Sequence, residues 1–183
     1  MDLRRTLLLF SFIFTGSLAI AQPKDRWTIQ DGGAIRWSIN DNIPHDDHLE
    51  MSGQQLSVVL RYGVDAQKRF HLNRSLVFPM LRMHPNKTQN NLKQRFDVNI
   101  PALVTVDDQT LLNEEVRDVT FNGIMRVESS FGYIYRRKEL KDAVQLTRVL
   151  YPSTNAAHYC EEYTFKNSSI TIFTSNKKIF KNS

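Results

Sequence analysis

The sequence holds a single cysteine, Cys160, among 183 residues. A chain with one cysteine forms no internal disulfide, so its stability must come from the burial of side chains. We interpret Cys160 as a small buried residue, because an isolated cysteine is far more often structural than nucleophilic. The sequence also lacks a Gly-x-Ser-x-Gly motif, a phosphate-binding loop and a Cys-x-x-Cys pair. No catalytic chemistry is therefore predicted from a short motif.

A concentrated basic face is missing as well. The formal net charge is +5, from 24 basic and 19 acidic side chains. Two of the basic residues lie near the N-terminus with one acid, and three lysines lie near the C-terminus. Setting these aside leaves 19 basic and 18 acidic side chains in residues 22–175. Binding to phosphate backbones requires clustered positive charge, so nucleic acid is not expected as a partner.

The one apolar run of note lies at the N-terminus. Residues 1–21 begin with Arg4 and Arg5, continue with an apolar stretch and end in Ala-Ile-Ala, which is the pattern of a helical signal peptide. The run is too short for a spanning helix, although an uncleaved anchor is the alternative. We expect the exported chain to begin at Gln22, to lie in the periplasm or outside the cell, and to have no membrane span after cleavage.

The rest of the chain shows no firm helical period. Short segments of β-branched, aromatic and alternating apolar residues are separated by turn residues. This pattern predicts an all-β fold, an antiparallel β-sandwich formed by one domain over residues 22–175, with an open barrel as the alternative. Residues 176–183 are predicted to be a frayed basic tail.

The strongest strand signal covers residues 54–64, where apolar side chains are nearly continuous. We predict a central strand covered on both faces, followed by a turn at 65–68 and two short strand pieces at 70–72 and 76–78. Asn122-Gly123 predicts a two-residue turn, because both positions of a primed turn favour positive φ. The basic segment 132–142 is predicted to be an extended loop.

His45, Asp46, Asp47, His48 and Glu50 precede this central strand, and they are predicted to lie in a loop at one end of the sheet. Three roles remain open for the loop: a structural or interface role, contact with a ligand, and metal binding. The spacing is not typical of a zinc or calcium site. On an extended chain His45 and His48 would face opposite ways, whereas on a helix they would face together.

Charged residues elsewhere do not form a recognisable catalytic pair. Glycoside hydrolysis needs two carboxyl groups roughly 5 to 10 Å apart across a cleft. The acidic pairs of this chain are adjacent in sequence, and adjacent residues of a strand point to opposite faces. Four scattered arginines are expected to cover apolar surface with their stems rather than to clamp an anion, although an anion clamp is the alternative: Arg61, Arg74, Arg82 and Arg95.

Five segments resemble the N-terminal region of exported bacterial six-hairpin glycosidases, the α/α-barrel enzymes grouped with α-L-rhamnosidases. These segments lie within residues 34–169, at positions 43–53, 58–65, 72–82, 150–154 and 160–167. The resemblance implies a supersandwich-like β-domain packed against a helical barrel that carries the catalytic carboxylates. It also implies that the loop with His45, Asp46, His48 and Glu50 faces the barrel and its sugar site.

A chain of this length would lack that barrel, so we expect a truncated copy with no catalytic residues and no cofactor of its own. The predicted function is an accessory sandwich of an exported carbohydrate-degrading hydrolase, with carbohydrate or the missing barrel as partner. A free-standing carbohydrate-binding module is the alternative, and it would need exposed aromatic side chains. Trp27 and Trp37 are the candidates, but Trp37 is predicted to be core. A metal-dependent enzyme that uses the His/Asp loop is a third hypothesis.

Overall fold

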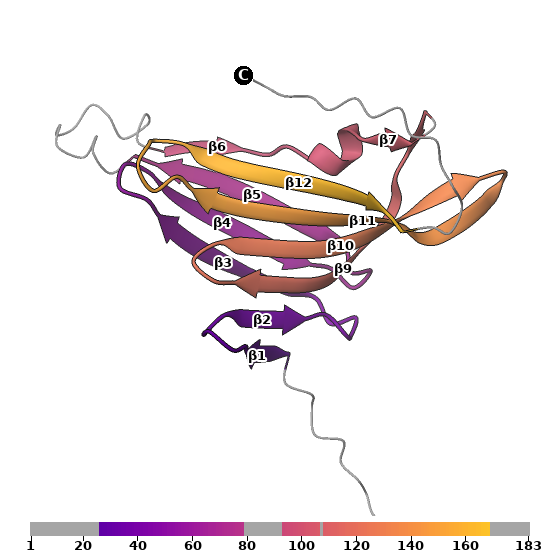
Figure 1. The fold of residues 1–183 in the computed structure, drawn as a ribbon, viewed down its shortest axis with the longest axis horizontal. Helices are drawn as coiled ribbons and strands as arrows, with labels where there is room; N and C mark the ends of the chain where they lie inside the picture. The colour runs from indigo at the N-terminus through magenta and orange to yellow at the C-terminus, as the bar shows by residue number, and fades with distance from the viewer. Residues whose placement is uncertain (1–25, 79–92, 107, 169–183) are drawn as a thin grey trace, which may run out of the picture.

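The protein is a two-layered, all-β structure (Figure 1). The computed structural model describes residues 26–78, 93–106 and 108–168. The larger sheet has six strands in the spatial order β1 (Trp27–Ile29), β2 (Ile35–Ser38), β9 (Leu112–Phe121), β10 (Met125–Tyr135), β11 (Lys138–Pro152) and β12 (Tyr159–Asn167). The smaller sheet has four strands in the order β3 (His45–Ser52), β4 (Ser57–Val64), β5 (Phe70–Val77) and β6 (Lys93–Phe96). The predicted all-β antiparallel fold is confirmed.

Two small elements connect the sheets. The 3-10 turn η2 (Ile100–Leu103) follows β6, and a two-stranded ribbon of β7 (Thr105–Val106) and β8 (Gln109–Thr110) leads into β9. No helix among the described residues is long and apolar enough to cross a membrane. The predicted signal peptide and the predicted basic tail lie outside the described residues.

The core lies between the two sheets because the strands alternate apolar and polar side chains. In β4 the inward residues Val58, Leu60, Tyr62 and Val64 are at most 3% exposed. They meet an apolar set from the larger sheet that is almost completely buried: Trp37, Val116, Val119, Met125, Val127 and Leu150. The prediction that Trp37 belongs to the core is confirmed, and Cys160 is half-buried.

The larger sheet is wider than the smaller one, and β1 and β2 extend beyond the edge strand β3 (Figure 1). Ile29 pairs with Ile35 in the register that also pairs Trp27 with Trp37, so all four side chains face inward. Nevertheless Ile29 is 81% exposed and Ile35 is 44% exposed. Where β1 and β2 carry Ile29 and Ile35, their inner face is therefore apolar but uncovered by the described part of the second sheet, whereas Trp37 on the same face is fully buried.

The structure confirms the position of β4 between β3 and β5 and the turn that follows it. However, Arg61 on its outer face is exposed, so the prediction that both faces are covered is wrong there. The pieces predicted at 70–72 and 76–78 form one continuous strand, β5. They merge because β5 pairs with β4 along its whole length.

Two predicted loops are strands instead. Residues 45–52 form β3, which pairs with β4 at every position although its sequence is polar. An edge strand tolerates such polarity because one of its faces and its outer edge meet water. Residues 132–142 form the tip of the hairpin between β10 and β11, with a two-residue turn at Arg136 and Arg137.

The Asn-Gly connection differs from the predicted two-residue turn. Phe121 pairs with Met125, so the loop has three residues, Asn122 to Ile124. Only Gly123 has a positive φ, of 70°.

Backbone conformations with positive φ divide between the two ends of the sandwich. The glycines Gly32, Gly33 and Gly123 lie in the β1–β2 and β9–β10 turns, which share one end, called the glycine end below. Six residues with side chains adopt positive φ at the opposite end, called the hairpin end: Lys68, Asp108, Asn113, Arg136, Arg137 and Asp142. A side chain at positive φ costs about 1–2 kcal/mol outside asparagine and aspartate. Backbone strain is therefore concentrated at the hairpin end.

Gly53 lets two turns from different sheets touch. Its amide donates to the Leu56 carbonyl in the β3–β4 turn, and a Cβ at this position would overlap the backbone carbonyl of Ser153 in the β11–β12 turn. We expect Gly53→Ala to lower the free energy of unfolding by about 2 kcal/mol or more, because backbone must move. Urea denaturation measures the loss, with Gln54→Ala in the same turn as a control. An unchanged midpoint for Gly53→Ala would refute the contact.

Candidate functional site

The four predicted site residues lie on β3 rather than in a loop, which corrects that prediction. Asp46, His48 and Glu50 are exposed on the outer face of the smaller sheet. His45 points inward, and its ring lies 4.8 Å from the ring of Trp37. The expectation that His45 and His48 face opposite ways on an extended chain is confirmed, so the four side chains do not form one site.

Asp46 has a partner that the sequence analysis missed. Across the outer face, Asp46 pairs in register with Gly63, and Gly63 pairs with His71 of β5. His71 Nε2 lies 2.5 Å from Asp46 Oδ1 above this glycine, and a Cβ on Gly63 would overlap both side chains. A glycine inside a strand often marks the close approach of two neighbouring groups. Gly63 within the predicted strand was therefore the sequence feature that could have indicated this contact. Both side chains are at least half exposed, so the pair adds little stability.

Metal binding was one of the roles left open for this segment. Within the described ranges, no three His, Cys, Asp or Glu side chains come together in a group that could hold a metal ion.

A charged cluster lies between the two sheets. Arg74 of β5 is 3% exposed and forms a two-pronged ion pair with Glu161 of β12, in which Nη2 lies 3.0 Å from Oε2. The hydroxyl of Tyr163 donates to Glu161 Oε2 at 2.6 Å and lies 3.1 Å from Arg74 Nη2. The guanidinium also donates to the Val98 carbonyl and lies 5.4 Å from the Phe96 ring. The expectation that Arg74 covers apolar surface is wrong.

Electrostatics in this cluster favour the charged arginine and the neutral tyrosine. Burial by itself would lower the pKa of Arg74, but the hydrogen bonds and charge of Glu161 outweigh burial and raise it. Burial, followed by the hydrogen bond to Glu161, raises the pKa of Tyr163 to about 12. Burial and the same carboxylate raise the pKa of Tyr159. The cluster is thus a fixed ion pair with protonated phenols around it.

A second buried ion pair lies closer to the hairpin end. Arg148 of β11 is 3% exposed, and its Nη2 lies 2.6 Å from Glu114 Oε1 of β9. Arg148 Nη1 donates to the Ser129 hydroxyl at 2.9 Å, and the guanidinium lies 5.1 Å from the Phe70 ring. The Arg148 N–H is not aimed at Glu114 Oε1, which has no hydrogen bond despite its close contact. Attraction between the two charges therefore holds this pair together.

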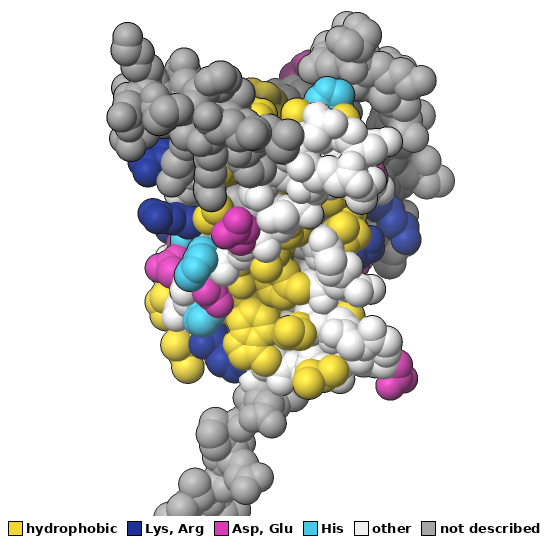
Figure 2. Space-filling view, turned by 90° about the vertical axis from the view of Figure 1, so that its left-hand side faces the viewer, with side chains coloured by type: hydrophobic (Ala, Val, Ile, Leu, Met, Phe, Trp, Pro, Cys, Tyr) yellow, Lys and Arg dark blue, Asp and Glu magenta, His cyan; other side chains and the backbone are white. Residues whose placement is uncertain are grey.

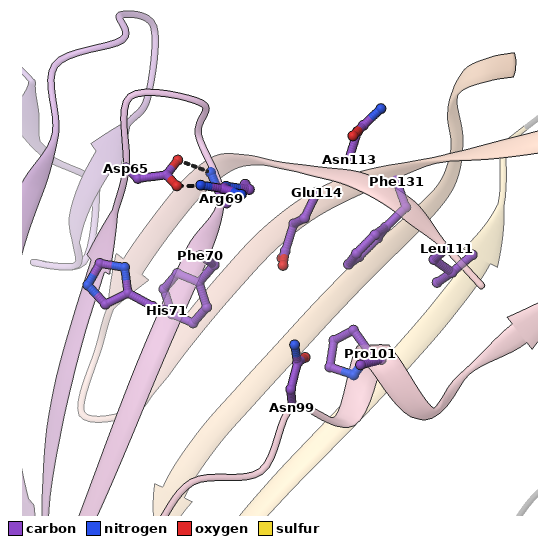
Figure 3. A pocket seen from close by; sticks show the side chains of 11 residues that line it. Asp65, Arg69, Phe70, His71, Asn99, Pro101, Leu111, Asn113, Glu114 and Phe131 are labelled. Atoms are coloured by element: carbon purple, nitrogen blue, oxygen red, sulfur yellow. Dashed lines mark hydrogen bonds and ion pairs between the residues drawn. The ribbon is translucent and has the colours of Figure 1, made fainter.

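A pocket of about 380 Å³ opens next to this second pair (Figure 3). The side chains of Glu114, Asn99, Phe70 and Phe131 point toward one another in it, and Pro101 lies beside them. The Asp65–Arg69 ion pair, with Arg69 Nε 2.7 Å from Asp65 Oδ2, lies at the rim. The ring of His71 points away from the pocket and toward Asp46.

The arrangement can hold a small polar ligand, since its volume is within the range of ligand pockets and both polar and apolar side chains line it. It does not present a glycosidase pair, because each interior carboxylate faces an arginine. The prediction that adjacent acids point apart is confirmed for Glu161 and Glu162, which contact Arg74 and Tyr151 respectively. Arg61 and Arg95 line another opening along β5 and β6, and Arg82 lies outside the described residues.

Comparison with known proteins adds no further identification. No family model matches the chain, and neither a curated protein nor a solved structure matches it.

We expect the loss of one partner of the Arg74–Glu161 pair to lower the free energy of unfolding strongly. Replacing both partners with apolar residues should lower it much less. Arg74→Met leaves the Glu161 charge buried, which should lower the free energy of unfolding by about 3–5 kcal/mol. The double variant Arg74→Met with Glu161→Leu should recover most of that loss. Urea denaturation tests both, with Arg126→Met as control, since the Arg126–Glu128 pair is about half exposed and should contribute less than about 1 kcal/mol. Equal losses in the single and double variants would contradict this account.

The tyrosines predict a fall in stability at alkaline pH. The pKa of Tyr163 rises from 10.0 to about 12 in the folded protein, so the folded state keeps a proton that the unfolded state loses. Its contribution is complete below about pH 10 and disappears as the pH rises to about 12. The free energy of unfolding, measured in urea across this range, should therefore decline less steeply for Tyr163→Phe than for the parent. Parallel curves would disprove the role of Tyr163.

Proposed function

We propose that this chain is an accessory β-sandwich of an exported carbohydrate-degrading hydrolase whose catalytic acid and base lie on a separate α/α-barrel domain. The observation that carries this proposal is the uncovered part of the inner face of β1 and β2, at Ile29 and Ile35. Ile29 and Ile35 belong to the layer that faces the core, but they are exposed. An apolar sheet face that the domain itself does not cover is typical of a surface that packs against another domain.

The exposed apolar side chains continue beyond these two strands. Ile35 pairs in register with Phe121, and Ile124 in the next loop is 39% exposed. Figure 2 shows hydrophobic side chains gathered on this side of the molecule, with histidine and acidic side chains beside them. The area suits an interface with an apolar centre and a polar border.

This position gives the β3 residues an interface role within the proposal. β3 is the edge strand of the smaller sheet, and Asp46, His48 and Glu50 are exposed on it. A helical domain that covers β1 and β2 would meet this edge. The resemblance to six-hairpin glycosidases implies the same role for these residues, and it supplies the identity of the covering domain.

The interior charges also support an accessory role. Glu114 and Glu161 are the carboxylates deepest in the sandwich, and each contacts a buried arginine. Glu161 joins the two sheets through Arg74, and Glu114 joins β9 to β11 within the larger sheet through Arg148, so both carboxylates have structural partners.

A free-standing carbohydrate-binding module is the second candidate, and the pocket with Glu114, Asn99, Phe70 and Phe131 favours it. Hydroxyl groups of a sugar would donate to the carboxylate while its C–H face packs on the rings. Against this candidate, Trp27 and Trp37 stack on each other at 5.3 Å with Trp37 fully buried, so they do not form an open platform.

Two measurements test the proposed function. We expect the purified polypeptide to release no sugar from a panel of aryl glycosides, and release by the polypeptide alone would overturn the proposal. We also expect Ile29→Lys with Ile35→Lys to lower the binding of a hydrophobic fluorescent dye and to leave the melting temperature nearly unchanged. Ile134→Lys at the opposite end is the matched control. Unchanged dye binding would remove the interface argument, and strong retention on a glycan array would favour the module.

A further inference from the structure

A two-stranded arm projects from the hairpin end. The pairing of β9 with β10 ends at Leu112 and Gly132, and the pairing of β12 with β11 ends at Asn167 and Val144. β10 and β11 continue to pair with each other as far as Tyr135 and Lys138. Residues 133–140 therefore extend beyond both neighbouring strands, at the right of Figure 1.

The turn at the tip of this arm has an unfavourable sequence for its shape. Arg136 and Arg137 both have positive φ, of 48° and 67°. Two-residue turns of this kind favour Asn-Gly or Gly-Gly, because a Cβ at positive φ is strained. At the other end of the sandwich the chain uses glycine for positive φ, as at Gly123. Strain that persists at an exposed tip indicates that the side chains themselves are used.

The arm carries positive charge that the domain does not neutralise. Arg136, Arg137, Lys138 and Lys141 are all exposed, and none of them forms an ion pair with an acid in the described part of the chain. The acids Glu139, in the arm, and Asp142, at its base, contact other residues instead. Glu139 accepts a hydrogen bond from Asn113 at 2.9 Å, and Asp142 forms an ion pair with Arg117 at 2.8 Å.

Apolar side chains lie among these cations. Ile134 is 39% exposed, and Tyr135 and Leu140 are half-buried. The guanidinium of Arg136 lies 5.1 Å from the ring of Tyr135. A soluble polyanion would be bound by the cations alone. By contrast, a bilayer surface offers anionic headgroups above an apolar layer, which suits basic, aromatic and aliphatic side chains together.

We propose that the β10–β11 arm, residues 133–141, docks onto an anionic lipid surface. Arg136, Arg137, Lys138 and Lys141 contact the headgroups, while Ile134, the exposed apolar side chain of the arm, reaches the boundary of the acyl layer. The contact is peripheral and reversible, since four cations and one apolar side chain are far from a spanning segment. It does not depend on the accessory role proposed above, because the arm lies at the end opposite to the uncovered apolar face.

The test compares variants of the whole chain on vesicles of phosphatidylcholine with and without phosphatidylglycerol, by co-sedimentation. Arg136→Asn with Arg137→Gly should weaken binding to the anionic vesicles roughly 25-fold, because each cation near such a surface contributes about 1 kcal/mol. Binding to the neutral vesicles should not change. The melting temperature of this variant should stay the same or rise, since the new turn relieves the strain.

Two further variants make the result specific. Arg36→Asn with Arg126→Asn removes the same charge from residues that are paired with Asp118 and Glu128, and it should leave vesicle binding within about twofold of the parent. Ile134→Ser should weaken binding to anionic vesicles several-fold and leave binding to dextran sulfate unchanged. The proposal is overturned if Arg136→Asn with Arg137→Gly binds anionic vesicles as the parent does. It is also overturned if Ile134→Ser has no effect on them, since the arm would then recognise only charge.

Discussion

The ion pair between Arg74 and Glu161 is the constraint around which this sandwich is arranged, since it joins a strand of each sheet through the core. Two sheets that meet only through apolar side chains can slide, because dispersion contacts have little directionality. A two-pronged ion pair has a fixed geometry. Tyr163 donates a further hydrogen bond to Glu161, and the Val98 carbonyl accepts one from Arg74. The relative position of β5 and β12 is thereby defined.

That position has consequences for both ends of the molecule. With β12 fixed over β5, the four-stranded sheet covers the strands from β12 to β9 and Trp37 of β2, and it leaves Ile29 and Ile35 uncovered at the far side. At the hairpin end, Glu114 of the second buried pair lines the pocket. The same packing therefore produces an apolar face on one side and a polar recess on another, and the two candidate functions proposed above correspond to these two features.

The strand richest in apolar residues was predictable, and the polar strands were not. β4 follows directly from its nearly continuous apolar residues. β3 was mistaken for a loop because polar side chains on an edge strand carry no apolar period. The arm of β10 and β11 was missed because Arg-Arg is not a turn signal. The Asp46–His71 contact depends on strand register through Gly63, which a sequence does not display.

The connectivity of the larger sheet implies an order of folding. Strands β9 to β12 follow one another along the chain and pair with their sequence neighbours, so they can form early through local contacts. β2 joins this sheet beside β9, and the Arg36–Asp118 contact between them spans 82 positions. The strands made first during synthesis must therefore wait for most of the polypeptide to appear before they find their place. During that interval their isoleucines and tryptophans would be available to a chaperone.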